Sequence, residues 1–187
     1  MPHKQALPRW REPGLINKSQ SHPFTVAVPR IAIPYETPGY VALLPSGWRF
    51  TEKYSPAPQH RFVTRMAGPN GISLLIDTTR HVEGDPADSA RTLEALFRHQ
   101  PTYRVTESFR TDAVGVRAFE WSFEYEGSHT TDIFFYKGGD GYAVLAEGSP
   151  KHATEIRAVA LKISRSIQPR PDRATRRATT GTPASAY

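Results

Sequence analysis

The sequence predicts an α+β fold in which a mostly antiparallel sheet of six to seven strands packs with two main helices. The clearest sign is the segment from Phe119 to Tyr125, where aromatic side chains alternate with polar ones, as expected of a strand with one buried face. Glycine-rich turns follow it, so residues 117–147 are expected to form three consecutive antiparallel strands. Two further segments, before and after this meander, carry helix start signals.

Shorter strands precede the meander. The apolar run at 40–44 is typical of a strand, which ends at Pro-Ser-Gly, and Trp48 follows this turn. Residues 61–66 and 71–78 are expected to pair, because their connection Gly-Pro-Asn-Gly contains Asn-Gly, a strong hairpin signal. Residues 103–109 form the strand that leads into the meander.

The two helices have recognisable boundaries. Asp85 can cap the first helix, proline takes its first position, and Pro101 stops it. Ser149 can cap the second helix, with Pro150 at its first position. The buried stripes would be Ala90, Leu93, Leu96 and Phe97 in the first helix and Ile156, Val159, Ala160 and Ile163 in the second. We expect the two helices to cover one face of the sheet and to leave the other bare.

Composition divides the chain into one domain and flanking segments. Residues 1–23 and 169–187 show no sustained apolar periodicity, so we expect two flexible basic tails. Residues 24–36 would form an extended arm or an edge strand, because apolar residues alternate there and prolines intervene. Residues 37–168 would form the α+β domain.

The net charge of +6 lies in the tails. Residues 1–30 contain five Lys or Arg and one acid, and residues 165–187 contain five Arg and one acid. The rest of the chain is therefore slightly acidic. This distribution favours solubility or weak anionic contacts of the tails over a nucleic-acid surface on the domain.

Several classes of chemistry find no support in the sequence. The chain has no cysteine, which excludes disulfides, Cys-type zinc sites and thiol catalysis. Its histidines stand far apart, and no P-loop, dinucleotide-binding or nucleophile-elbow motif occurs, so we expect no metal, no cofactor and no enzyme. Neither a secretory signal nor an apolar run of membrane-spanning length is present, so we expect a cytoplasmic protein without a membrane span.

Four stretches carry a resemblance to a known fold. They are GYVALLPSGW at 39–48, ISLLIDTT at 72–79, ARTLEALF at 90–97 and IRAVALKISRSI at 156–167. In this order they resemble the Mog1/PsbP-like fold, in particular the bacterial domain-of-unknown-function group that includes LpqN-type and DcrB-type proteins. The resemblance covers about residues 37–168 and implies a non-catalytic accessory domain. It carries over no catalytic residues, and the missing lipobox cysteine counts against an envelope role.

One face of the predicted sheet is the best candidate for a binding surface. If Arg104 and Arg110 share a side with Glu120, Glu124 and Asp132, they form a mixed-charge platform that the helices leave bare. Such a platform is either simply solvated, or it binds a partner chain, a second copy of the protein or its own arm.

The function expected from these patterns is a non-catalytic protein-binding or assembly module, of the accessory, adaptor or chaperone-like kind. It would use the sheet face or edge and the N-terminal arm to hold another protein or a second copy. The alternative is a small-ligand or glycan-binding protein with a cleft near Trp48, since large aromatic residues after turns often line pockets. The residues expected to bind a partner are Trp48, Arg104, Arg110, Glu120, Glu124 and Asp132 in the domain and Phe24, Val26 and Val28 in the arm.

Overall fold

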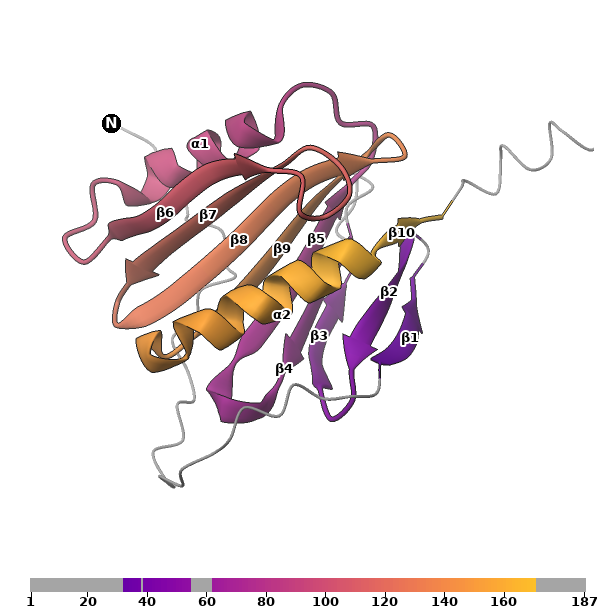
Figure 1. Ribbon diagram of the computed structural model, residues 1–187, viewed down its shortest axis with the longest axis horizontal. Coiled ribbons are helices and arrows are strands. Elements are labelled where there is room, and N and C mark those ends of the chain that lie inside the picture. The colour runs from indigo at the N-terminus through magenta and orange to yellow at the C-terminus, as the bar shows by residue number, and fades with distance from the viewer. Residues whose placement is uncertain (1–31, 38, 55–61, 171–187) are drawn as a thin grey trace, which may run out of the picture.

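The computed structural model describes residues 32–37, 39–54 and 62–170, which form ten strands and two α-helices (Figure 1). The strands are β1 (Ala32–Glu36), β2 (Tyr40–Pro45), β3 (Arg49–Tyr54), β4 (Phe62–Ala67), β5 (Ser73–Thr79), β6 (Arg104–Thr111), β7 (Ala118–Tyr125), β8 (Ser128–Lys137), β9 (Asp140–Gly148) and β10 (Gln168–Pro169). The helices are α1 (Pro86–Phe97) and α2 (Ala153–Ser166), with short 3-10 helices η1 (Pro69–Gly71) and η2 (Pro150–His152).

The strands form two antiparallel sheets. The main sheet has seven strands in the order β3-β4-β5-β9-β8-β7-β6, and a smaller sheet has the order β1-β2-β10. The predicted α+β class and the mostly antiparallel sheet are therefore confirmed. The apolar run at 40–44 lies in the smaller sheet, and the strand β3 was not predicted from the sequence.

The register of the strands fixes which residues share a side, because residues paired across antiparallel strands point to the same side. Trp121 pairs with Asp132, which in turn pairs with Leu145. Glu120 pairs with Ile133 and therefore lies on the opposite side. We call these the α1 side and the α2 side, after the helix that packs on each.

The α2 side carries the main core of the protein. The helix α2 packs on β8 and β9 and also on β2, so the smaller sheet lies beside it (Figure 1). The predicted stripe of this helix is buried as expected. Ser149 makes no side-chain capping bond, and the turn after it is 3-10, so the predicted cap of the second helix is wrong and α2 begins at Ala153.

The α1 side carries a smaller aromatic core. The helix α1 packs on β7 and β8, where Phe97 lies against Trp121 and Phe123. The prediction that both helices cover one face is therefore wrong. The reason is visible in β8, whose residues from His129 to Phe135 are all buried, which requires cover on both faces.

The predicted start of α1 is confirmed. The carboxylate of Asp85 accepts a hydrogen bond from the backbone N–H of Ala87 at 2.9 Å, as predicted for the cap. Leu96, predicted to be buried, is 42% exposed. It therefore lies at the solvent side of the helix stripe.

Candidate functional site

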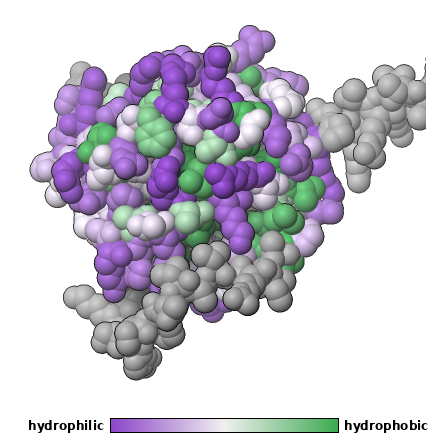
Figure 2. Space-filling view, in the orientation of Figure 1, coloured by the Kyte–Doolittle hydropathy of each residue, from purple (hydrophilic) through white to green (hydrophobic). Residues whose placement is uncertain are grey.

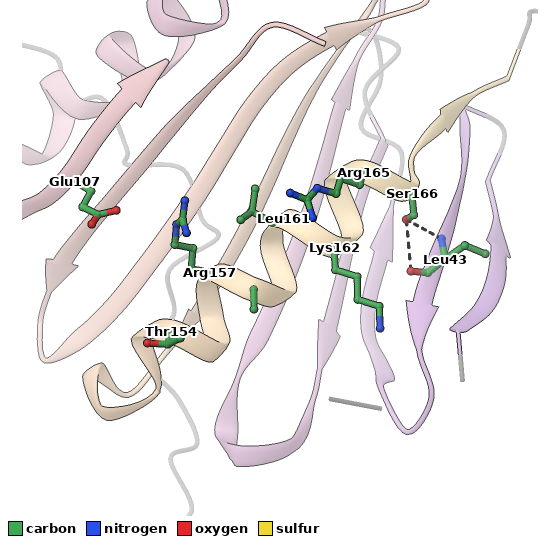
Figure 3. A pocket seen from close by; sticks show the side chains of 9 residues that line it. Leu43, Glu107, Thr154, Arg157, Leu161, Lys162, Arg165 and Ser166 are labelled. Carbon is green, nitrogen blue, oxygen red and sulfur yellow. Dashed lines mark hydrogen bonds between the residues drawn. The ribbon is translucent and has the colours of Figure 1, made fainter. Parts of the chain in front are cut away.

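An open cavity of about 780 Å³ lies along α2 (Figure 3). We call it the α2 groove. Its lining residues are Leu43, Glu107, Thr154, Arg157, Ala158, Leu161, Lys162, Arg165 and Ser166. Figure 3 shows Glu107 on β6 at one side of the helix and Leu43 on β2 at the other side. The groove therefore joins the exposed edge of the main sheet to the smaller sheet.

An ion pair fixes the β6 side of the groove. Arg157 of α2 donates two hydrogen bonds to the carboxylate of Glu120, with Nε–Oε1 at 2.5 Å and Nη2–Oε2 at 3.1 Å. The side chain of Glu120 is completely buried, so the pair compensates a charge that would otherwise be costly to bury. The guanidinium also lies 5.9 Å from the ring centre of Phe109 on β6. These contacts hold the N-terminal half of α2 against the β6–β7 end of the sheet.

Two hydrogen bonds fix the other end of the helix. The backbone N–H of Leu43 donates to the hydroxyl of Ser166 at 2.9 Å (Figure 3). That hydroxyl donates to the carbonyl of Ile163 at 2.7 Å. Because β10 pairs only with Tyr40 and Val41, the side chain of Ser166 satisfies a backbone group that no strand covers there.

The groove combines apolar and cationic chemistry. Leu43 and Phe109, one at each flank, are 43% and 38% exposed. The face seen in Figure 2 shows apolar and hydrophilic residues side by side. Arg165 is exposed, and its Nε donates a hydrogen bond to the backbone carbonyl of Ala113 at 2.6 Å. Because a carbonyl carries no net charge, this contact does not neutralise the guanidinium. The chemistry suits a ligand that brings apolar groups together with a negative charge.

The predicted mixed-charge platform is not a single surface. Arg104 does share the α2 side with Glu124, and its guanidinium lies 2.8 Å from that carboxylate. Arg110 lies on the α1 side, where it binds both carboxylate oxygens of Asp85 at 2.8 Å and 2.6 Å. Together with the Ala87 backbone bond, this contact lowers the pKa of Asp85, the backbone bond being the larger cause.

The physical reason for this split is a bulge. The register of β6 against β7 shifts between Val105 and Glu107. An extra residue in one strand reverses the side to which all following residues point. Arg104, which precedes the bulge, therefore shares the α2 side with Glu120. Arg110, which follows the bulge, points to the α1 side. The platform is also not bare, since α2 reaches Glu120.

Asp132 lies on the α1 side rather than on the predicted platform, and it is buried. Its side chain is 3% exposed, and its Oδ1 atom has no hydrogen-bond partner. Burial, and to a smaller extent the nearby carboxylate of Asp77, raise the pKa of Asp132 to about 8. Asp132 is therefore mostly protonated at neutral pH.

Trp48 packs at the edge of the main core instead of lining the groove. It contacts the core cluster of the α2 side, and it is not among the residues that line the groove. Its ring lies so close to Gly68 that a Cβ atom there would be 2.5 Å from the indole. Phe24, Val26 and Val28, the other predicted partner-binding residues, lie outside the described residues.

The described residues contain no group of three or more His, Cys, Asp and Glu side chains arranged to hold a metal ion. In the same part of the chain, no helix combines the length and the apolar character needed to cross a membrane.

Comparison with solved structures identifies the fold. The protein is similar to cyanobacterial PsbP from Synechocystis, with a TM-score of 0.55, 12% identity, and coverage of 80% of this chain and 98% of that chain. The chain therefore has the Mog1/PsbP-like fold, as the sequence predicted.

Two further structures are similar to a lesser degree. One is a Pseudomonas aeruginosa protein of unknown function described as a putative regulator, with a TM-score of 0.45, 17% identity, and coverage of 75% of this chain and 99% of that chain. The other is LpqN of Mycobacterium tuberculosis, involved in cell envelope biogenesis, with a TM-score of 0.42, 14% identity, and coverage of 75% and 91%. The sequence matches no protein-family model and no curated protein.

Most residues of the α2 groove were missed by the sequence analysis. Arg157, Lys162 and Arg165 are cations on the polar side of a helix, a pattern that ordinarily indicates only a solvated face. Leu43 belongs to an apolar run that predicts a buried strand. Their assembly into one groove depends on the smaller sheet lying beside α2, which no local pattern shows.

Proposed function

We propose that this protein is a non-catalytic protein-binding or assembly module that holds a segment of another protein in the α2 groove. The observation that carries the proposal is the groove itself, which is open, long and lined by both apolar and cationic side chains. Interfaces between proteins are built around a few exposed apolar anchors with charged groups at the rim. Leu43 is such an anchor in the lining, Phe109 is an exposed aromatic ring beside the groove on β6, and Arg165 is such a rim charge.

The chemistry of the groove also describes the partner. A segment that fills it needs apolar side chains at two points, one near β2 and one near β6. It also needs at least one carboxylate, which would neutralise Arg165, because Arg157 is already paired with Glu120. An apolar segment with acidic residues fits these requirements.

The edge strand β6 extends the same surface. Seven of its eight residues are exposed, and within the described residues it pairs only with β7. Unpaired backbone groups at such an edge can bind an extended segment as an additional strand. The bulge and the charged side chains Arg104, Glu107 and Arg110 disfavour the addition of an arbitrary strand to this edge. A segment that binds there therefore has to carry charges complementary to these three residues.

The proposal is tested on tagged protein purified from its own cells and examined by native mass spectrometry. We expect a complex with another protein chain at defined stoichiometry. A monomer by light scattering, with no partner in the native mass spectrum or in a pull-down, would overturn the proposal.

A further inference from the structure

The two ends of the α2 groove carry opposite charges. Glu107 on β6 lines one end, where it pairs with Ser122 and therefore lies on the α2 side. It is exposed, and no residue in the described part of the chain forms an ion pair with it. The neighbouring Arg157 is bonded to Glu120, which is the main reason for the raised pKa of Arg157, and the charge of Glu107 adds to this shift. A negative charge is therefore available to a ligand at the β6 end.

The other end of the groove is positive. Lys162 and Arg165 both line the groove near the C-terminal end of α2. Figure 3 shows Arg165 and Leu43 at this end, away from Glu107. Arg165 forms its hydrogen bond with the neutral carbonyl of Ala113, and none of the described carboxylates forms an ion pair with it. A positive charge is therefore available to a ligand at the β2 end.

Each end combines its charge with an apolar side chain. Phe109 follows Glu107 on the same side of β6, and Leu43 lines the groove at the end that carries Arg165. Arg157, which neighbours Glu107, and Arg165 are eight positions apart on α2, or about 12 Å at the rise of an α-helix. An extended segment covers this distance in about four residues.

Building on the proposed function, we propose that the α2 groove selects its segment by a pair of opposite charges about four residues apart. A carboxylate of the segment, next to an apolar residue, faces Arg165 at the Leu43 end. A cation, next to a second apolar residue, faces Glu107 at the Phe109 end. The charges thereby fix which end of the segment lies at β6. A segment that is acidic at both points is repelled by Glu107.

Synthetic peptides test this selection without the natural partner. Three fluorescein-labelled peptides contain the same leucine and phenylalanine, about four residues apart in an otherwise neutral sequence. The first carries glutamate next to the leucine and lysine next to the phenylalanine, the second carries glutamate at both places, and the third carries lysine at both. Fluorescence anisotropy measures their affinity for the full-length protein at low ionic strength, because salt screens exposed charges.

We expect the natural protein to bind the first peptide about tenfold more tightly than either of the others. Glu107→Lys should transfer this preference to the peptide with two glutamates, and Arg165→Glu should transfer it to the peptide with two lysines. Glu83→Lys is the matched control, because Glu83 is exposed in the loop before α1 and does not line the groove. This control should keep the preference of the natural protein. Thermal unfolding confirms that the variants fold.

Equal affinities for the three peptides, no binding of any of them, or a preference that both charge reversals leave unchanged would overturn the proposal. The proposed function is decided separately, by the capture of a partner chain in the native mass spectrum. If Leu43→Glu weakens that capture while Glu107→Lys and Arg165→Glu do not, the groove binds a partner without selecting it by charge. That result would overturn the charge selection and leave the proposed function intact.

Discussion

Arg157 on α2 and Glu120 on β7 form a two-point ion pair, in which the carboxylate is fully buried and the guanidinium remains 43% exposed. This pair joins the helix that lines the groove to the strand that the sequence assigned to a bare platform. Replacing Arg157 by Ala leaves a buried carboxylate without its partner.

We expect Arg157→Ala to lower the free energy of unfolding by about 1 to 3 kcal/mol, a range reduced from the fully buried case because solvent screens the exposed guanidinium. Urea unfolding at pH 7 measures this change. Arg104→Ala is the matched control, since Arg104 makes a comparable but exposed contact with Glu124, and no measurable change is expected there. Equal effects of the two substitutions would show that the burial of Glu120 is not energetically important.

Asp132 predicts a specific pH dependence of stability. Its pKa is raised from 3.8 to about 8 in the folded protein, first by burial and then by Asp77. Between these two values the folded state binds a proton that the unfolded state has lost. The contribution of this group therefore makes stability fall as pH rises from about 4 to about 8, by at most about 1.4 kcal/mol per pH unit.

Asp132→Asn removes this titration while keeping the shape of the side chain. Relative to the natural protein, we expect the variant to gain stability steadily from pH 5 to pH 8, as followed by urea midpoints at each pH. Parallel curves for the two proteins over this range would mean that Asp132 titrates normally in the folded state.

Substitutions at Gly68 and Trp48 test whether the Trp48 side chain packs in the core or lines a ligand cleft. The backbone of Gly68 is extended, with φ at −110°, so alanine there meets no backbone strain. Its Cβ would nevertheless lie 2.5 Å from the ring. We expect Gly68→Ala to cost about 1 to 3 kcal/mol of stability, as for overpacked sites.

The double variant Gly68→Ala with Trp48→Leu provides the control. Because the smaller side chain leaves room for the methyl group, the two effects should be less than additive in denaturation experiments. Full additivity would indicate that Trp48 moves away freely, as expected for a ring at the wall of an open cleft.

The sequence predicted the meander of β7, β8 and β9 because each strand carries its pattern locally and glycines mark the turns. It did not predict the bulge in β6, which depends on pairing with β7 and which moved Arg110 to the other side from Arg104. The cover of both sheet faces was also missed, since alternation of Trp121 with Ser122 suggests one wet face, although both residues are buried.

The candidate site was less predictable than the fold. Glu120 was identified as a candidate from its polar position in a strand, but its partner Arg157 lies 37 residues away and is brought to it only by the docking of α2. Leu43 reaches the groove through the position of the smaller sheet. Contacts of this kind depend on tertiary packing, which neither periodicity nor turn signals encode.

The most direct test of the proposed function compares two equally exposed leucines on different surfaces. Leu43 in the α2 groove is 43% exposed, and Leu96 on α1 is 42% exposed. In a quantitative pull-down of the partner, we predict that Leu43→Glu lowers capture by about tenfold or more, as for an anchor residue. Leu96→Glu should capture the partner as well as the natural protein does. Undiminished capture by Leu43→Glu, with both variants folded, would contradict the assignment of partner binding to the α2 groove.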